Sequence, residues 1–150
     1  MAILIALHNL LRWVVVILAA AALYRAYSGW LGKKEWQDGD RKVGVFFGAA
    51  MDTQLLLGGI LYFFGAWGYK AFAIAQQAPT GQKLNLLFFA VEHAITMLLA
   101  VVLVHVGTVM ARRATDAVSK HKRAALWFSA AVLLVLVAIP WMQRPLLPAF

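Results

Sequence analysis

Four long apolar stretches constrain this chain more than any other feature of its sequence. They run over residues 3–24, 43–66, 84–111 and 124–142. At a rise of ~1.5 Å per residue, each can cross the ~30 Å hydrocarbon core of a bilayer as a helix. Helices satisfy their own backbone polar groups, which hydrocarbon demands. The sequence therefore predicts an all-α integral membrane protein, a bundle of four transmembrane helices that forms a single domain over residues 1–150.

Composition agrees with this class and excludes several others. Hydrophobic residues make up 63% of the chain, and charged residues only 13%, against about 25% in soluble domains. A disordered chain and a nucleic-acid-binding domain are therefore excluded, and the bilayer is the expected surrounding. The chain has no cysteine, which excludes disulfides, Cys-ligated iron–sulfur clusters and covalently attached c-type haem. Any redox centre must be held by His, Met or carboxylate side chains.

The first apolar stretch has a cleaved signal peptide as its main alternative reading. It lacks a basic segment at its start, and its run of small residues at 19–22 lies inside the apolar block rather than after it. Both features are atypical of signal peptides. We expect a retained transmembrane helix.

The basic residues predict how the helices are oriented. Ten Lys and Arg residues lie in the two connectors 25–42 and 112–123, whereas the connector 67–83 and the C-terminal tail hold Lys70, Lys83 and Arg144. Cytoplasmic loops of membrane proteins carry an excess of Lys and Arg. We expect both basic connectors in the cytoplasm and the N and C termini outside.

Ionisable side chains inside the apolar stretches are the candidate functional residues, because such groups are costly in a membrane. There are six of them: His8, Arg12, Asp52, Glu92, His93 and His105. The fourth histidine, His121, falls in a basic connector. We expect it to be a solvated surface residue.

The depth of two histidines suggests a cofactor. With the predicted topology, His8 and His93 lie about six and about five residues outward of the midpoints of their helices. Two imidazoles at equal depth on facing helices are what a bis-histidine b-type haem needs. Hydrogen bonding between helices, metal binding, quinone contact and proton transfer are the alternatives for this pair.

His105 lies about 18 Å along the helix from His93 and about 120° around it. The first helix offers no histidine at the matching depth, so we expect one haem rather than two. His105 is then expected to hydrogen-bond a backbone carbonyl or a hydroxyl. A quinone site or a proton relay is the functional alternative.

Arg12 stays charged at any physiological pH and lies near the midplane, so it needs a compensating charge. Asp52, Glu92 and a haem propionate are the candidates. The simplest reading is a buried pair of Arg12 with Asp52 that fixes helix register.

Short motifs along the chain resemble a known group of proteins. Residues 7–13 read LHNLLRW, and residues 24–30 and 52–58 read YRAYSGW and DTQLLLG. Together with the Glu92-His93 pair, these resemble small bacterial four-helix membrane proteins labelled cytochrome b-like, in which an L-H-x-x-x-R-W segment opens the first helix. The resemblance implies haem b with His8 and His93 as axial ligands, Arg12 as the neighbouring cation, and the bacterial inner membrane as location.

We therefore expect a membrane b-type haem protein that transfers electrons, with other redox membrane subunits or a quinone as partners. No phosphate-binding or hydrolase motif is present, so an electron-transfer protein or subunit is favoured over a stand-alone enzyme. The main alternative is a non-haem structural or accessory subunit of a larger respiratory-type membrane complex. A small transporter lined by Arg12, Asp52 and Glu92 is disfavoured, because the helices lack paired Gly or Pro breaks at the midplane.

Overall fold

The computed structural model describes residues 1–141, and its regular elements are helices. Four spans are long and apolar enough to cross a membrane: α1 (Ala2–Leu31), α2 (Asp38–Phe64), a third span over 80–112, and α6 (Ala117–Ala138). The predicted all-α class with four transmembrane helices is confirmed. Met142, Arg144 and the C terminus lie outside the described residues.

The third span is a composite of three elements rather than one α-helix. It consists of α4 (Thr80–Leu87), the π-helix η1 (Phe88–His93) and α5 (Ala94–Arg112). A further short helix, α3 (Ala71–Gln77), occupies the preceding connector. A π-helical turn holds more residues than an α-turn, so it changes which face the next residues present, and such turns often occur at functional sites.

The helices reach beyond the apolar stretches at their basic ends. α1 continues to Leu31 and α2 starts at Asp38, which leaves a short connector between them. α2 begins with a capping box, in which the backbone N–H of Gln37 donates to Asp40 Oδ2 at 2.9 Å. At the start of α6, Asp116 accepts from the backbone N–H of Ser119 at 2.8 Å. Hydrogen bonds from the Ser119 side chain and then from its backbone N–H lower the pKa of the Asp116 carboxyl. Polar caps therefore extend the helices into the interfacial region.

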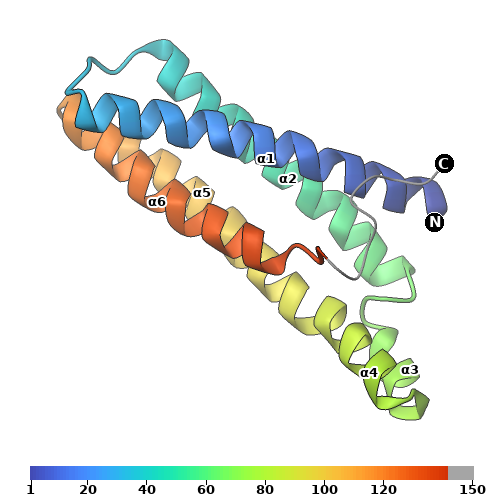
Figure 1. The fold of residues 1–150 in the computed structure, drawn as a ribbon. Helices are drawn as coiled ribbons and strands as arrows, with labels where there is room; N and C mark the ends of the chain where they lie inside the picture. The colour runs from blue at the N-terminus through green and yellow to red at the C-terminus, as the bar shows by residue number, and fades with distance from the viewer. Residues whose placement is uncertain (142–150) are drawn as a thin grey trace.

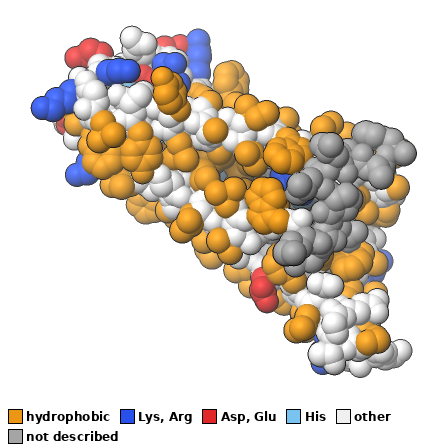
Figure 2. Space-filling view, viewed as in Figure 1, with side chains coloured by type: hydrophobic (Ala, Val, Ile, Leu, Met, Phe, Trp, Pro, Cys, Tyr) orange, Lys and Arg blue, Asp and Glu red, His pale blue; other side chains and the backbone are white. Residues whose placement is uncertain are grey.

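The four spans form an antiparallel ring (Figure 1). α1 packs against α2 and α6, and α5 packs against the same two helices, so α1 and α5 lie diagonally across the bundle. The two basic connectors lie at one end, and α3 and α4 lie at the other. Figure 2 shows charged side chains gathered at the first end and hydrophobic side chains covering the flanks.

Small side chains dominate the interior where the four helices meet. Phe47 and Phe128 fill its centre in an edge-to-face contact, with ring centroids 5.7 Å apart. Around them the buried core is largely alanine: Ala19, Ala22, Ala26, Ala100, Ala111, Ala124, Ala125 and Ala131. Helices in a membrane associate through such close backbone contacts, because lipid tails are as apolar as the core.

A buried carboxylate joins three helices at the basic end. Asp40 of α2 is 8% exposed and accepts from Arg25 Nε of α1 at 2.8 Å. His121 of α6 approaches the same carboxylate, with Nε2 4.0 Å from Oδ2. The Arg25–Asp40 ion pair therefore connects α1 to α2 at this end, and both ring nitrogens of His121 are buried without a hydrogen-bond partner among the described residues.

The expectation that His121 is a solvated surface residue is wrong. Its side chain is 1% exposed and packs against Trp36, with ring centroids 4.8 Å apart. The reason is helical spacing: α6 has already begun at Ala117, and His121 shares its buried face with Ala124, Ala125 and Phe128. The adjacent Lys122 points outward instead and places its ammonium 5.7 Å from the centroid of the Trp30 ring.

The fit of His121 depends on a glycine opposite it, which gives a test of the fold. A Cβ on Gly29 would overlap the His121 ring, whereas a Cβ on Gly59 of α2 would meet no described atom within 4 Å. Gly29→Ala should destabilise the protein by about 1–3 kcal/mol through overpacking. The matched change Gly59→Ala should be neutral or stabilising by up to about 1 kcal/mol, since glycine weakens a helix interior. Thermal unfolding in detergent measures both, and equal effects would contradict the His121 packing.

Candidate functional site: a histidine pair and an Asp–His pair

His8 lies on the inner face of α1. It shares that face with Arg12, Val15 and Ala19, which are 6%, 2% and 5% exposed. The spacing of four, three and four residues keeps all of them on one side of a helix. The His8 side chain is itself half-buried, so α1 directs its imidazole toward the centre of the bundle.

His93 is the last residue of η1, directly before α5. Its ring lies beside two rings from the same π-helix, with centroids 6.2 Å from Phe88 and 5.9 Å from Phe89. The preceding α4 and the following α5 are ordinary α-helices, so the π-turn sets which way His93 points relative to both. His93 is half-buried.

The two histidines meet across the diagonal of the bundle. The centroids of the His8 and His93 rings are 6.4 Å apart, and their planes are inclined by 72°. α1 and α5 are not neighbours in the ring of helices, so their side chains reach each other through the interior.

A hydrogen bond orients the His93 imidazole. Its Nδ1 lies 2.9 Å from the backbone oxygen of Ala138, at the C-terminal end of α6. A carbonyl oxygen only accepts, so Nδ1 carries the proton and donates it. The second ring nitrogen, Nε2, then has a free lone pair and can bind a metal or accept a hydrogen bond.

Two residues of α2 lie next to His8. Gln54 Nε2 donates to the backbone oxygen of His8 at 3.0 Å. Within residues 1–141, His8 Nδ1 and Gln54 Oε1 are buried without a hydrogen-bond partner. A Cβ on Gly58 would lie 3.3 Å from His8 Cε1, so the absence of a side chain at Gly58 makes room for the imidazole. The site around His8 therefore contains buried polar atoms that form no hydrogen bond with the described residues.

Arg12 lies one helical turn beyond His8 and is buried. Its guanidinium carbon is 5.6 Å from the centroid of the neighbouring Trp13 ring. Asp52, considered above as its counter-charge, instead bonds to His105. Glu92, the other candidate, has an exposed side chain. Arg12 lies beside His8, as the helical spacing predicts, and Asp52, one of the counter-charges considered for it, bonds to His105.

Asp52 and His105 form the second polar pair within the spans. His105 Nε2 of α5 lies 2.7 Å from Asp52 Oδ1 of α2, and the side chains are 52% and 50% exposed. The sequence suggested a carbonyl or a hydroxyl as the partner of His105, and the structure provides a carboxylate. Nearby, a Cβ on Gly48 would lie 3.7 Å from His105 Cε1. The His105 ring therefore lies close to the backbone of α2 at Gly48.

The composition of these sites limits which metals they could hold. Among the described residues, no cluster of three or more His, Cys, Asp or Glu side chains could bind a metal ion. Structural and catalytic zinc sites need three or four protein ligands. The histidine pair itself offers two imidazoles.

Comparison with protein-family models, with curated proteins and with solved structures finds no match to this chain.

The Asp52–His105 pair can be tested by its effect on stability. Replacing one partner leaves the other polar group facing lipid, so Asp52→Leu and His105→Leu should each be destabilising. The double change should recover much of the loss, with a coupling of about 0.5–2 kcal/mol, the range for hydrogen bonds between membrane helices. Unfolding measured in lipid bicelles for the four proteins gives the coupling. Strictly additive effects would show that the two side chains do not interact.

Proposed function

We propose that this chain is a membrane b-type cytochrome, in which His8 and His93 hold one haem b in the outer half of a four-helix bundle. Its role is to transfer electrons between a donor in the membrane and an acceptor at the outer face. The motifs at residues 7–13 and at Glu92-His93, which resemble cytochrome b-like proteins, support the same assignment.

The observation that carries the proposal is the spacing of the two rings. A bond from a metal to an imidazole nitrogen is about 2 Å long, so two imidazoles on opposite sides of one metal have centroids roughly 6 Å apart. The His8 and His93 centroids are 6.4 Å apart. The spacing of the two rings is therefore one at which both imidazoles would bind a single metal ion.

The surroundings of the pair suit a ligand role. The bond from His93 Nδ1 to the Ala138 carbonyl leaves Nε2 for the metal and orients the ring, as the outer-shell partners of metal-bound histidines do. The flanking helices present small residues here: Gly58 of α2 beside His8, and Ala138 of α6 beside His93.

When bound, haem b supplies reversible one-electron chemistry. The residues of this chain provide the surroundings. His8 and His93 would hold the iron through one imidazole each. The apolar helices exclude water, so charges nearby act through a low dielectric constant. Arg12, one turn from His8, adds a fixed positive charge that favours the reduced over the oxidised state of the site.

The location follows from the charge asymmetry. Both basic connectors lie at one end of the bundle, and we propose that this end faces the cytoplasm of a bacterium, across its inner membrane. His8 and His93 then lie nearer the outer surface, which places the redox centre within reach of an outer acceptor.

Replacing either ligand tests the assignment. The protein expressed with haem available should show the reduced-minus-oxidised spectrum of a low-spin b-type cytochrome. His8→Ala and His93→Ala should each lose that low-spin spectrum, since one axial bond is removed, while the protein remains helical by circular dichroism. Difference spectra of the purified variants provide the measurement.

The chain offers matched controls at adjacent positions. Asn9→Ala and Glu92→Ala change the residue next to each histidine and should leave the spectrum unchanged. A wild-type spectrum in His93→Ala would refute the assignment of that ligand. Wild-type protein that takes up no haem would refute the proposed function altogether.

The charge of Arg12 gives an independent test of where the haem lies. Arg12→Gln should lower the midpoint potential, on the order of tens of millivolts for a unit charge in a partly buried site. The control Arg25→Gln removes an equal charge at the distant basic end and should change the potential much less. Redox titration of the three proteins compares them. Equal shifts in both variants would place the haem away from Arg12.

A further inference from the structure

A small hollow lies between α2 and α5 at the basic end of the bundle, where Figure 2 shows Lys and Arg side chains gathered. Its lining includes Trp36, Asp40, Arg41, Gly44, Thr108 and Arg112. The hollow has a volume of about 10 Å³, which is roughly what one water-sized group needs. One oxygen atom of a larger ligand fits it, and the rest of such a ligand lies outside.

The hollow lies at the depth of lipid head groups. Arg41 is in the first turn of α2, and Arg112 is the last residue of α5. The lining extends from these helix ends toward the apolar layer by about one turn, or roughly 5 Å, to Gly44 and Thr108. The next residue of α2, Val45, is 44% exposed. A ligand with a polar head and an apolar tail therefore matches the order of side chains at this place.

Both arginines of the lining have N–H groups that the described part of the chain does not use. Arg41 donates to Asp38 Oδ1 through Nε at 3.0 Å and through Nη2 at 2.7 Å, which leaves the N–H groups of Nη1 as donors. Arg112 is exposed and forms no ion pair within residues 1–141. Guanidinium groups with free N–H donors are well suited to bind phosphate oxygens.

The carboxylate in the lining already has partners of its own. Asp40 Oδ1 accepts from Arg25 Nε at 2.8 Å, and Asp40 Oδ2 accepts from the backbone N–H of Gln37 at 2.9 Å. The negative charge of Asp40 is therefore compensated by Arg25, and the charges of Arg41 and Arg112 decide which ligand the hollow attracts.

This end of the bundle keeps an excess of positive charge. Asp38 forms ion pairs with both Arg41 and Lys42, so one carboxylate compensates only one of these two cations. The connectors 25–42 and 112–123 together hold ten basic and four acidic residues. A lipid with a net negative head group is therefore favoured over a zwitterionic lipid, whose ammonium group the excess charge repels.

We infer that the hollow at Arg41 and Arg112 binds the phosphate of an anionic phospholipid. One phosphate oxygen enters the hollow, the two guanidinium groups compensate the charge, and the acyl chains lie along the exposed apolar surface beginning at Val45. Trp36 completes the lining with an indole ring, which prefers the headgroup level. The inference goes beyond the proposed electron transfer, because this site lies at the other end of the bundle from the histidine pair and needs no haem.

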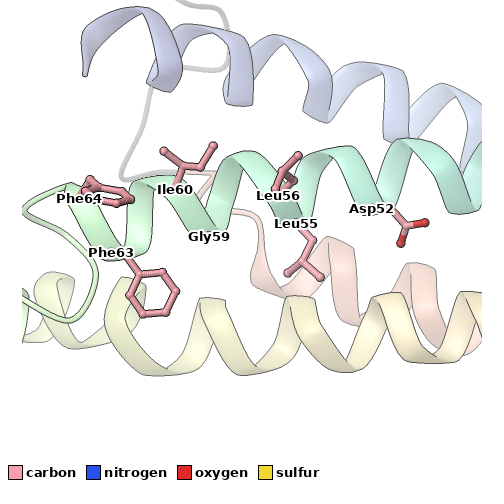
Figure 3. A pocket seen from close by; sticks show the side chains of 7 residues that line it. All are labelled: Asp52, Leu55, Leu56, Gly59, Ile60, Phe63 and Phe64. Carbon is pink, nitrogen blue, oxygen red and sulfur yellow. The ribbon is translucent and has the colours of Figure 1, made fainter.

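A larger apolar surface on α2 differs from the hollow in its charge. It runs from Asp52 past Gly59 to Phe63, and its lining comes from α2 alone (Figure 3). The one charged side chain in this lining is the acidic Asp52. An acyl chain can lie there, but Asp52 does not attract an anionic head group. Selectivity for anionic lipid is therefore expected at the hollow and not at this surface.

Lipid titration tests the inference. Delipidated protein in detergent is titrated with dioleoyl phosphatidylglycerol or with dioleoyl phosphatidylcholine, and native mass spectrometry counts the lipids bound to each chain. We expect one phosphatidylglycerol to bind at least about five-fold more tightly than phosphatidylcholine, the size of effect expected for a cation beside an anionic head group. Inorganic phosphate at millimolar concentration should not displace the lipid, because it lacks the acyl chains.

The chain offers a matched control beside each arginine. Arg41→Gln and Arg112→Gln should each weaken phosphatidylglycerol binding at least about five-fold and leave phosphatidylcholine binding unchanged. Lys42→Gln removes a cation that pairs with the same Asp38, and Arg113→Gln removes the exposed cation next to Arg112. Neither control residue lines the hollow, so both variants should change binding less than two-fold. Circular dichroism checks that the four variants remain helical.

Four results would overturn the inference. Equal affinity for the two lipids would mean that the hollow does not select a charge. Equal losses in all four variants would show only a diffuse attraction to the basic end, and unchanged binding in both Arg41→Gln and Arg112→Gln would place the lipid elsewhere. Displacement by inorganic phosphate would indicate a site for a soluble anion. Haem-free protein should bind the lipid equally well, so failure of the proposed function would leave this result intact.

Discussion

Close contact between helix backbones is the constraint on which this structure depends. In a bilayer the hydrophobic effect does not drive helices together, because lipid tails are as apolar as the side chains. Helix association therefore rests on close packing and on hydrogen bonds between helices. The interior accordingly contains mostly alanine, and Gly29 and Gly107 lie directly against His121 and the Trp127–Phe128 side chains. At the basic end, the Asp40 carboxylate adds an ion pair between α1 and α2. The helices pack closely at this basic end, and His8 and His93 lie toward the other end of the bundle.

The histidine pair uses features that arise where regular helices end or change. The last carbonyls of an α-helix have no partner within the helix. Ala138 ends α6, and its carbonyl accepts from His93 instead. His93 in turn ends the π-helix that interrupts the third span. A helix end and a π-turn therefore together orient one imidazole, while the regular face of α1 orients the other.

Much of this arrangement could be predicted from the sequence. Stretches of about 20 apolar residues give the four spans, and counting residues from the span midpoints puts His8 and His93 at equal depth. The buried position of His121 was also predictable, because Ala124, Ala125 and Phe128 follow it at helical spacing. It was missed because the charged residues around it suggested a connector rather than the first turns of α6.

Other features depend on contacts between helices that one sequence does not encode locally. The π-helix at Phe88–His93 carries no marker residue, and it becomes evident only from its hydrogen bonding. The pairing of Asp52 with His105 depends on the rotation of α2 against α5. Depth made Arg12 a candidate partner for Asp52, since both side chains lie near the middle of their spans.

The central proposal is that His8 and His93 would together hold one haem iron. The most direct test is the electron paramagnetic resonance spectrum of the oxidised, haem-loaded protein. If both imidazoles bind the iron, the oxidised protein gives a low-spin ferric signal. The account predicts this signal in the unaltered protein and its loss in His8→Ala and in His93→Ala. A high-spin signal, or a low-spin signal that survives both substitutions, would contradict it.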